Sequence, residues 1–415
     1  MTTHDSADAI TAYNPFAGNR LGLDAAPVVS AHIAERAVVV DFADGTTTRF
    51  HHQWLRASCY CTTCGDPADG IRFTTVISFD SRITPATVGA DDGDLVVEWP
   101  DGHRSVFGPD WLSHHAYDDA GRARRAGWRP TLWRSELATD FPTVAWADAV
   151  DDRGAGRLRL YQILRDFGIV QVTGLGTDPA QTAALAGVLG PIHETTVYGR
   201  IYDVRAEPVA KLGAKTGMPQ APHIDDAFYY SPPGIDVFHC LVNTAEGGMS
   251  TYVDGFAIAD AIRTEAPAAF DLLTTQPIQQ IRRHPEEIDL RNRGPLISLD
   301  EWGNPRGIRY FDRALAPLDL EPELIEPMYD AIREYNRRMV DPAFIAEIRV
   351  APGDGVLIDN HRVMHGRTAF DPSAGRHIRL CHVPRDEFHG RLRELSRTLD
   401  HAHHDLHLPQ GSTLS

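Results

Sequence analysis

Two segments that are far apart in the sequence contain candidate metal ligands. They are Pro222-His223-Ile224-Asp225 and Asp359-Asn360-His361-Arg362-Val363-Met364-His365-Gly366-Arg367. Residues i and i+2 of an extended chain project from the same side, so His223 and Asp225 can present an imidazole and a carboxylate to one point. A second histidine from a distant strand would complete a set of two histidines and one carboxylate, which non-haem Fe(II) oxygenases use because it leaves coordination positions open. The competing interpretation is a strand-end histidine hydrogen-bonded to a carboxylate. We predict a barrel built around this metal.

The third iron ligand has three candidates, which are His365, His361 and His239. We prefer His365, because it follows an apolar run typical of a buried strand and lies in a short segment rich in His, Arg and Gly. Arg376 lies 11 residues beyond it, where a guanidinium could bind a carboxylate of a cosubstrate through two parallel hydrogen bonds. Arg376 and Arg379 fall on opposite faces of a predicted strand, so only one of them can face the barrel interior.

Length and composition restrict the class of protein. The chain of 415 residues is long enough for two domains, and 42% hydrophobic with 23% charged residues is typical of a soluble globular protein. The net charge of -17 and the pI near 5.6 argue against nucleic acid or an anionic membrane as partner. No run of 18 apolar residues predicts a membrane span, and the polar N-terminus does not resemble a secretion signal. We expect a cytoplasmic protein.

Three of the five cysteines are crowded into the segment Cys59-Tyr60-Cys61-Thr62-Thr63-Cys64. Thiolates bind zinc, and a structural zinc site needs four ligands, so a fourth must come from elsewhere. His103 is the preferred donor, because a Pro-Asp-Gly turn places it at the tip of a predicted hairpin. The alternative to a zinc site is three free thiols. The other candidates for the fourth ligand are His51, His52, His114 and His115.

Turn and periodicity signals predict the element order. Asp-Gly turns predict hairpins over 37–50 and 94–107. Gly168 is the expected C-cap of the first long helix, a buried strand follows it, and beyond Gly217 we expect short strands with a single clear helix. This order predicts a mainly β fold with flanking helices, a double-stranded β-helix (jelly-roll) catalytic domain behind a small β-rich zinc-binding domain. The predicted helices are 157–167, 178–189 and 322–339.

The predicted boundaries follow from these elements and from shifts in composition. The basic, Gly-punctuated segment near residue 121 is typical of a linker. The polar ends of the chain are expected to be tails. The predicted organisation is therefore a tail (1–27), the zinc-binding domain (28–118), a linker (119–140), the double-stranded β-helix domain (141–400) and a second tail (401–415).

Taken together, the motifs resemble those of the γ-butyrobetaine hydroxylase and trimethyllysine dioxygenase family, a TauD-like family. The resemblance spans about residues 35 to 395, with the order of motifs intact. It implies a zinc site at Cys59, Cys61, Cys64 and His103 and an iron site at His223, Asp225 and His365. The motifs that carry it are Cys59-x-Cys61-x-x-Cys64, Trp99-Pro100-Asp101-Gly102-His103, His223-x-Asp225, Asp254-Gly255-Phe256, Asp359-Asn360-His361-Arg362 and His365-Gly366-Arg367.

The same resemblance implies the cofactors and the partners. It implies Fe(II), a structural zinc, and 2-oxoglutarate and O2 as cosubstrates. The distal carboxylate of 2-oxoglutarate is expected at Arg376, with the hydroxyl of Ser250 as a further partner. It also implies a homodimer.

The substrate pocket is where this chain departs from the family. The family holds a trimethylammonium group in an aromatic cage, a cation–π arrangement. Tyr198 and Tyr202 match two positions of that cage, whereas Asp226 and His382 stand where the family has aromatic residues. An aspartate in the wall favours a cation that can donate hydrogen bonds, or a more polar group.

Two further positions bear on the acidic end of the substrate. Lys211 and Arg313 align where the family presents asparagines to the substrate carboxylate. Two added cations favour a more highly charged acid such as a phosphonate. We therefore hypothesise a zwitterionic small molecule with an ammonium group at one end and an acid at the other. The competing interpretation of Asp226, Lys211 and Arg313 is a set of surface or lid ion pairs.

The predicted function is hydroxylation of a C–H bond in a small ammonium-containing acid, a betaine-like carboxylate or phosphonate, by an Fe(II)/2-oxoglutarate-dependent dioxygenase. The first alternative is the same cofactor chemistry used for desaturation, rearrangement or cyclisation in a biosynthetic pathway. A second is a non-catalytic, zinc-stabilised binding protein, against which the intact metal and arginine positions argue. A nucleic-acid-binding zinc module is disfavoured by the charge of -17.

Overall fold

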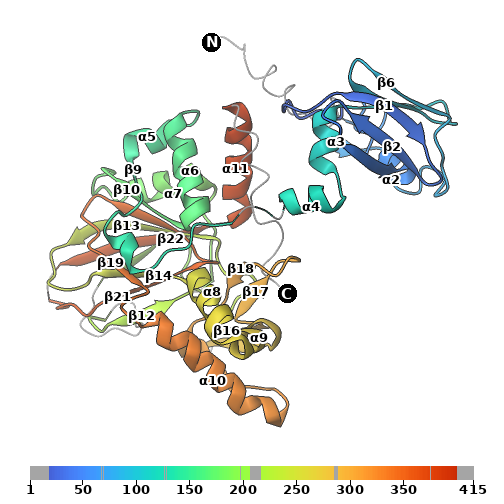
Figure 1. The fold of residues 1–415 in the computed structure, drawn as a ribbon. Coiled ribbons are helices and arrows are strands. Elements are labelled where there is room, and N and C mark those ends of the chain that lie inside the picture. Colours follow the sequence, from blue (N-terminus) through green and yellow to red (C-terminus); the bar gives the residue numbers. More distant parts are fainter. Residues whose placement is uncertain are drawn as a thin grey trace. The chain divides into compact units, whose positions relative to one another are not determined.

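The chain folds into two compact units that divide near residue 128, and each is described by itself (Figure 1). Lys211 and the predicted tail 401–415 lie outside the residues that the structure describes. Within the described residues, no helix is both long and apolar enough to cross a membrane. The computed structural model describes residues 18–66, 68, 70–125, 127, 129–196, 198–205, 216–284, 288–373 and 375–399.

The first unit is built on two antiparallel three-stranded sheets. Both predicted hairpins are confirmed, because they form the pairs β2–β3 and β7–β8. Phe50, Leu95 and Phe107 are fully buried in the core of this unit, beside Trp99 and Trp111. Its elements are β1 (Val28–Ile33), β2 (Ala37–Phe42), β3 (Thr47–His51), α2 (His52–Ala57), β4 (Gly65–Asp66), β5 (Ile71–Arg72), β6 (Thr87–Asp91), β7 (Asp94–Glu98), β8 (Arg104–Phe107), α3 (Pro109–His115) and α4 (Asp119–Arg125).

Part of the predicted N-terminal tail packs against this unit. The Asn19 side chain is buried and donates a hydrogen bond to the Ser58 carbonyl at 2.7 Å. The Asp110 carboxylate accepts hydrogen bonds from the backbone N–H groups of Leu21 and Gly22 at 2.7 and 2.8 Å. The polar residues of this segment are therefore partners of buried groups, and polarity alone does not distinguish that role from a solvated tail. Residues 1–17 lie outside the described part of the chain.

The second unit contains two sheets that form the expected double-stranded β-helix. The larger has the strand order β11-β22-β13-β20-β10-β9 and the smaller β12-β21-β14-β19. All of these pairs are antiparallel except β9–β10. The strands are β9 (Thr143–Ala145), β10 (Ile169–Thr173), β11 (Tyr202–Arg205), β12 (Gln220–His223), β13 (Ile235–Asn243), β14 (Ser250–Asp254), β19 (Ile345–Ile348), β20 (Gly355–Asp359), β21 (Val363–Arg367) and β22 (Arg376–Val383).

Helices cover the outside of these sheets (Figure 1). One apolar cluster joins α6, α7 and α11 to the larger sheet, and another joins α8, α9 and α10 to the smaller sheet and its hairpins. The expected helices are confirmed at α6, which ends at the left-handed Gly168 (φ 72°), at α7 and at α10. The elements are α5 (Trp146–Val150), α6 (Ala155–Phe167), α7 (Gln181–Leu189), α8 (Gly255–Glu265), α9 (Pro267–Thr275), β15 (Ile278–His284), β16 (Ile288–Gly294), β17 (Ile297–Leu299), β18 (Pro305–Ile308), α10 (Pro322–Met339) and α11 (Arg385–Thr398).

The expectation of a single helix beyond Gly217 was wrong. Helices α8, α9 and α11 also lie in this region. Seven of the 11 residues of α8 are buried, so its polar face is narrow, limited to residues such as Asp260 and Thr264, and a periodic pattern reveals it only weakly. Residues 119–125 of the predicted linker form helix α4 in the first unit, and the second unit begins at Arg129.

A buried ion pair joins the start of α8 to the turn before β21. The Arg362 guanidinium donates to both carboxylate oxygens of Asp254 at 3.0 and 2.8 Å, and both residues are almost fully buried. Arg362 also donates to the backbone carbonyls of Asp166 and Thr131. Asp254 caps α8 by accepting from the Phe256 N–H at 3.0 Å. One carboxylate therefore ties together three separate parts of the unit.

We expect Asp254→Ala to destabilise the second unit by about 3–5 kcal/mol, because it leaves a buried guanidinium without its counter-charge. Urea unfolding followed by circular dichroism measures this change. The matched control is Asp289→Ala, which removes the exposed partner of Arg291 and should leave the unfolding free energy nearly unchanged. Equal effects of the two substitutions would contradict the central place given to the Asp254 pair.

Candidate active site

Strand pairing brings the three predicted iron ligands together. His223 at the end of β12 lies opposite His365 of β21 in the antiparallel register. One carboxylate oxygen of Asp225 is 3.2 Å from Nε2 of His223 and 3.7 Å from Nε2 of His365. All three ligand atoms lie within 4.8 Å of one another, so a single metal ion can contact them all. This donor set leaves coordination positions open and is suited to non-haem iron.

The two rival histidines have other partners. His239 is fully buried between the Thr182 hydroxyl at 2.9 Å and the Gly176 carbonyl at 2.8 Å. His361 donates through Nε2 to the Pro232 carbonyl at 2.9 Å. Neither belongs to the cluster around Asp225.

Hydrogen bonds define the tautomer of His223. Gln220 accepts a hydrogen bond from Arg367 through Oε1 at 2.9 Å, so its amide nitrogen is the group that faces Nε2 of His223 at 3.1 Å. An amide N–H donates, and Nε2 must therefore carry the lone pair. The proton then lies on Nδ1, which donates to the Ala221 carbonyl at 3.0 Å. His223 thus presents an unprotonated Nε2, the form that binds a metal.

Asn360 fixes the position of Asp225. Its side chain accepts from the Asp225 N–H at 2.8 Å and donates to the Asp225 carbonyl at 3.0 Å. Burial opposes ionisation of Asp225, but the neighbouring rings of His365 and His223 outweigh it and hold its pKa below the ordinary value. Burial lowers the pKa of His365 to about 3. An ionised carboxylate and neutral imidazoles are the protonation states that metal binding requires.

A cavity of about 370 Å³ opens beside this cluster. The rings of Tyr198 and Tyr202 line it as a stacked pair, with centroids 4.4 Å apart and planes 21° apart. Ser250, Arg376 and the exposed Arg313 line it as well. The predicted residues Tyr198, Tyr202, Ser250, Arg313 and Arg376 are therefore brought to the same space as the three metal-ligand candidates.

The two arginines of β22 point in different directions, as alternation along a strand requires. Arg376 lines the cavity, and its Nε has no hydrogen-bond partner among the described residues. Arg379 donates to the Pro179 carbonyl at 2.6 Å and lies 3.3 Å from the Asp203 carboxylate. Arg376 is thus the arginine available to an anion inside the barrel.

Asp226 adjoins the metal cluster in a left-handed backbone conformation (φ 52°). It lines the cavity and is 3% exposed, and its Oδ2 has no hydrogen-bond partner among the described residues. Burial and the adjacent Asp225 raise the pKa of Asp226 to about 7. A carboxyl group near neutrality can accept or donate a hydrogen bond.

His382 occupies a different environment from the one expected of a cage residue. Its ring is 6.1 Å from that of Tyr202, but its Nδ1 lies 2.6 Å from a carboxylate oxygen of Asp236. Both side chains are at most 2% exposed. Burial opposes the charged imidazole, yet the Asp236 carboxylate outweighs it and raises the pKa of His382 to about 9. His382 is therefore engaged by Asp236, and it is not among the residues that line the cavity.

Several residues around the cavity were missed by sequence reasoning. Arg282 of β15 lines the cavity, as do Gln220 and Arg367. Arg367 belongs to the quoted motif, but nothing in the sequence indicates that it binds Gln220. Asp236 is paired with His382 only through the β13–β22 register, which sequence spacing does not reveal.

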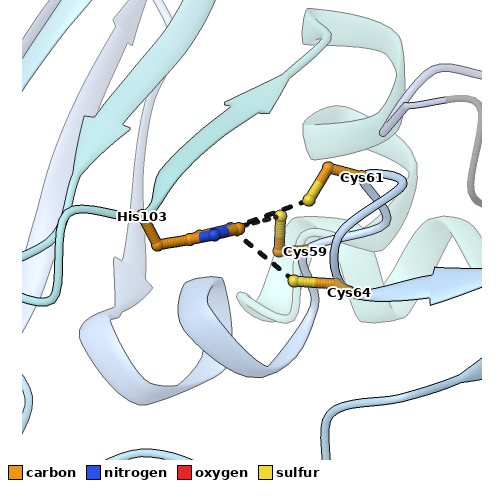
Figure 2. Close-up of side chains that lie close together, drawn as sticks. All are labelled: Cys59, Cys61, Cys64 and His103. Carbon is orange, nitrogen blue, oxygen red and sulfur yellow. Dashed lines mark hydrogen bonds between the residues drawn. The ribbon is translucent and has the colours of Figure 1, made fainter.

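The predicted zinc ligands converge in the first unit, as Figure 2 shows. Nε2 of His103 lies 3.3, 3.7 and 3.6 Å from the sulfur atoms of Cys59, Cys61 and Cys64. Bonds of 2.0–2.3 Å to tetrahedral zinc place neighbouring ligand atoms about 3.5 Å apart, so these distances fit. Burial raises the pKa of the Cys59 thiol to about 12, and a bound metal is what would deprotonate such a thiol.

The other histidines considered for this site are not part of the cluster. Nδ1 of His51 is 2.7 Å from the Tyr117 hydroxyl, and that of His115 is 2.9 Å from the Trp111 carbonyl. His52 is buried in α2, and His114 lies beside His115 at the end of α3. Three cysteines and one histidine form a closed donor set that indicates structural zinc.

The fold and the two metal-ligand clusters define a non-haem iron oxygenase with a zinc module. The sequence profile "Taurine catabolism dioxygenase TauD, TfdA family" matches residues 131–382, and "Gamma-butyrobetaine hydroxylase-like, N-terminal" matches residues 29–113. The chain therefore belongs to the TauD, TfdA dioxygenase family, with the N-terminal domain of γ-butyrobetaine hydroxylase-like proteins. The protein is an Fe(II)/2-oxoglutarate-dependent dioxygenase.

Known proteins with similar sequences cover most of the chain. Gamma-butyrobetaine dioxygenase of Pseudomonas sp. (strain AK-1) is 36% identical over 89% of this chain and 97% of its own. Trimethyllysine dioxygenase of Gallus gallus is 30% identical, over 83% of each chain. Gamma-butyrobetaine dioxygenase of Homo sapiens is 27% identical over 84% of this chain and 91% of its own. A solved structure of an asparagine oxygenase aligns over 59% of this chain and 93% of its own, with 17% identity and a TM-score of 0.47.

We expect Cys61→Ser to lower the zinc content and the melting temperature of the first unit, because a structural zinc contributes directly to folding. Elemental analysis and differential scanning calorimetry measure the two effects. Thr62→Ala changes the exposed neighbouring residue and should leave both values unchanged. Unchanged zinc content and melting temperature in Cys61→Ser would show that the assigned zinc site is wrong.

The burial of His361 predicts loss of stability in acid. Burial, with Arg385 nearby, lowers the pKa of His361 to about 4, whereas an unfolded chain titrates near 6.5. The unfolded state therefore binds the proton first, so this contribution to stability is present above about pH 6.5 and is lost as the pH falls towards 4.

Between pH 7 and pH 5 this one residue should remove about 2 kcal/mol from the free energy of unfolding. His361→Gln keeps an N–H donor for the Pro232 carbonyl and removes the titration. Urea unfolding at both pH values should show a smaller loss in the variant than in the wild type. Equal losses of unfolding free energy in the two proteins would mean that folding does not lower the pKa of His361.

Proposed function

We propose that this dioxygenase hydroxylates a C–H bond of a small acid that carries an ammonium group, with Fe(II) bound by His223, Asp225 and His365. The observation that carries the proposal is one cavity lined by these three residues, by a stacked tyrosine pair and by arginines. The relatives named for γ-butyrobetaine and trimethyllysine support a substrate of this class.

Arg376 and Ser250 bind the cosubstrate in this proposal. Bound iron, with 2-oxoglutarate and O2, supplies the oxidising power for hydroxylation of an unactivated C–H bond. The unpartnered Nε of Arg376 supports an anion at this place, since a buried guanidinium nitrogen otherwise lacks an acceptor. A guanidinium matches a carboxylate with two parallel hydrogen bonds. Ser250 lines the same cavity, and its hydroxyl adds a further donor.

The tyrosine pair and Asp226 receive the ammonium group. A cation over the face of an aromatic ring is stabilised by about 0.5–2 kcal/mol, more when water is excluded. The faces of Tyr198 and Tyr202 already lie parallel, and burial raises the pKa of Tyr198, so it stays a neutral phenol. Asp226 adds a carboxyl group to the same wall and favours a cation that can donate hydrogen bonds.

Arginine side chains receive the acid group of the substrate. Arg313 lines the cavity in addition to Arg376. This supply of positive charge favours a carboxylate or a phosphonate, since each can accept several charge-assisted hydrogen bonds. The predicted contribution of Lys211 concerns a residue outside the described part of the chain.

The first test measures succinate formation from 2-oxoglutarate with Fe(II) added under anaerobic conditions before O2. The panel holds γ-butyrobetaine, trimethyllysine, amino acids, and aminoalkyl- and trimethylammonio-phosphonates. Succinate stimulated by one ammonium-containing acid supports the proposal and names the substrate class. No succinate with any member, while iron still binds, would favour the non-catalytic binding protein.

Two variants locate the chemistry within the site. Asp225→Ala should abolish turnover without lowering the melting temperature, since it removes an iron ligand. Arg313→Ala should raise KM for the acidic substrate about 10- to 100-fold with kcat largely kept, because a charged hydrogen bond contributes about 1.5–3 kcal/mol. Full-rate turnover of γ-butyrobetaine, unaffected by Arg313→Ala, would contradict the assignment of the acid end.

A further inference from the structure

Two buried polar atoms face each other behind the metal-ligand cluster. Nδ1 of His365 and Oδ2 of Asp236 each lack a hydrogen-bond partner among the described residues. These two atoms are 3.9 Å apart. A buried polar group without a partner costs about 1–3 kcal/mol. The two unsatisfied atoms can satisfy each other with a shift of about 1 Å, since an N–H···O bond is about 2.9 Å long.

Asp236 is held in place by its other oxygen. It lies on β13, directly opposite His382 of β22, and Oδ1 is 2.6 Å from Nδ1 of His382. The side chain of Asp236 is 0% exposed and that of His382 is 2% exposed. A paired cation is what makes a buried carboxylate tolerable in such a place. With Oδ1 engaged by His382, Oδ2 remains on the side of His365.

The two histidines of the metal cluster differ in the hydrogen bonding of Nδ1. Nδ1 of His223 already donates to the Ala221 carbonyl at 3.0 Å, so its ring is oriented by its own strand. The ring of His365 packs edge-on against that of Phe238, with the ring centroids 4.9 Å apart. Its Nδ1 has no hydrogen bond within the described residues. Its Nε2 faces Asp225 at 3.7 Å, which leaves Nδ1 directed away from the metal position. His365 is therefore the ligand whose Nδ1–H still needs an acceptor to orient the ring.

We propose that Asp236, held by His382, is a positioning residue that accepts the Nδ1–H of His365 and thereby directs Nε2 of His365 to the metal. A carboxylate in this place fixes the tautomer and the rotation of a ligand histidine, and it increases the basicity of the coordinating nitrogen. The pair Asp236–His382 consequently controls metal affinity without touching the metal or the substrate. The inference rests on the iron site of the proposed function.

The test measures Co(II) affinity, because Co(II) is a divalent ion that is stable in air and accepts the same nitrogen and oxygen ligands. Full-length protein is used, with its zinc retained as checked by elemental analysis. Asp236→Asn is nearly isosteric but removes the charge, and we expect the Kd for Co(II) by isothermal titration calorimetry to rise about 10- to 100-fold. A rise of less than about threefold in folded protein would overturn the proposal.

The matched control is Asp203→Asn on β11. Asp203 also pairs with a histidine of β22, since its carboxylate contacts Nε2 of His377, but it is 45% exposed and outside the metal-ligand cluster. Its substitution should leave the Kd unchanged. An equal loss of affinity in Asp203→Asn would mean that any damage to β22 weakens the site, which would also overturn the specific role of Asp236.

A double-mutant cycle separates positioning from simple charge attraction. If Asp236 acts through His365, then Asp236→Asn should have little further effect on Co(II) affinity in a His365→Ala background. A persistent loss in that background would indicate a general electrostatic effect instead. His365→Ala alone tests the proposed function, because unchanged affinity in this single variant would remove His365 from the iron site. A large loss in His365→Ala with none in Asp236→Asn would refute only the inference drawn here.

A measurement on the wild type covers the case in which Asp236→Asn does not fold. Histidine side chains labelled with 15N are observed by NMR in protein whose iron site is loaded with diamagnetic Zn(II), and His365→Gln assigns the signal. We expect a slowly exchanging Nδ1–H and a metal-bound Nε2 for His365. A metal-bound Nδ1, or an Nδ1–H that exchanges rapidly with water, would exclude a hydrogen bond to Asp236.

Discussion

The antiparallel pairing of β12 with β21 is the constraint on which the active site depends. It sets His223 opposite His365, and a slip of β21 by one residue would turn the ring of His365 to the other face of the sheet. Gly366 makes this close pairing possible, because a Cβ atom there would lie 2.4 Å from the Gln220 carbonyl oxygen. The arrangement of the metal ligands thus depends on a glycine at position 366.

The segment from Asp359 to Arg362 connects this pairing to the rest of the unit. Asp359 binds Arg385 of α11 at 2.7 Å, and Asn360 holds both backbone groups of Asp225. His361 bonds to the loop carbonyl of Pro232, and Arg362 pairs with Asp254 at the start of α8. Four consecutive side chains therefore fasten four different segments around one turn. They form a recognisable motif because each satisfies a specific buried group, although none of them belongs to the metal-ligand cluster.

Sequence patterns predicted the parts of the fold that have a strong local signal. The left-handed Gly168 and the amphipathic α10 were evident, whereas α8 was missed because most of its residues are buried and its polar face is narrow. Motif spacing and family resemblance identified the metal-ligand sets, since their residue types are distinctive. The Asp236–His382 pair was not predicted, because only the strand register brings the two residues together. The sequence around either residue does not indicate its partner.

The cavity is rich in arginine although the chain as a whole is acidic. A protein with a net charge of -17 has four arginines among the residues that line this one cavity, which are Arg282, Arg313, Arg367 and Arg376. Arg367 donates hydrogen bonds to the Gln220 side chain and the Thr216 carbonyl, so part of its guanidinium is already engaged. The aspartates and tyrosines that line the same cavity are groups that suit a cation. The ammonium-containing acid proposed as substrate would engage both kinds of group, and selectivity would then depend on the distance between its two charges.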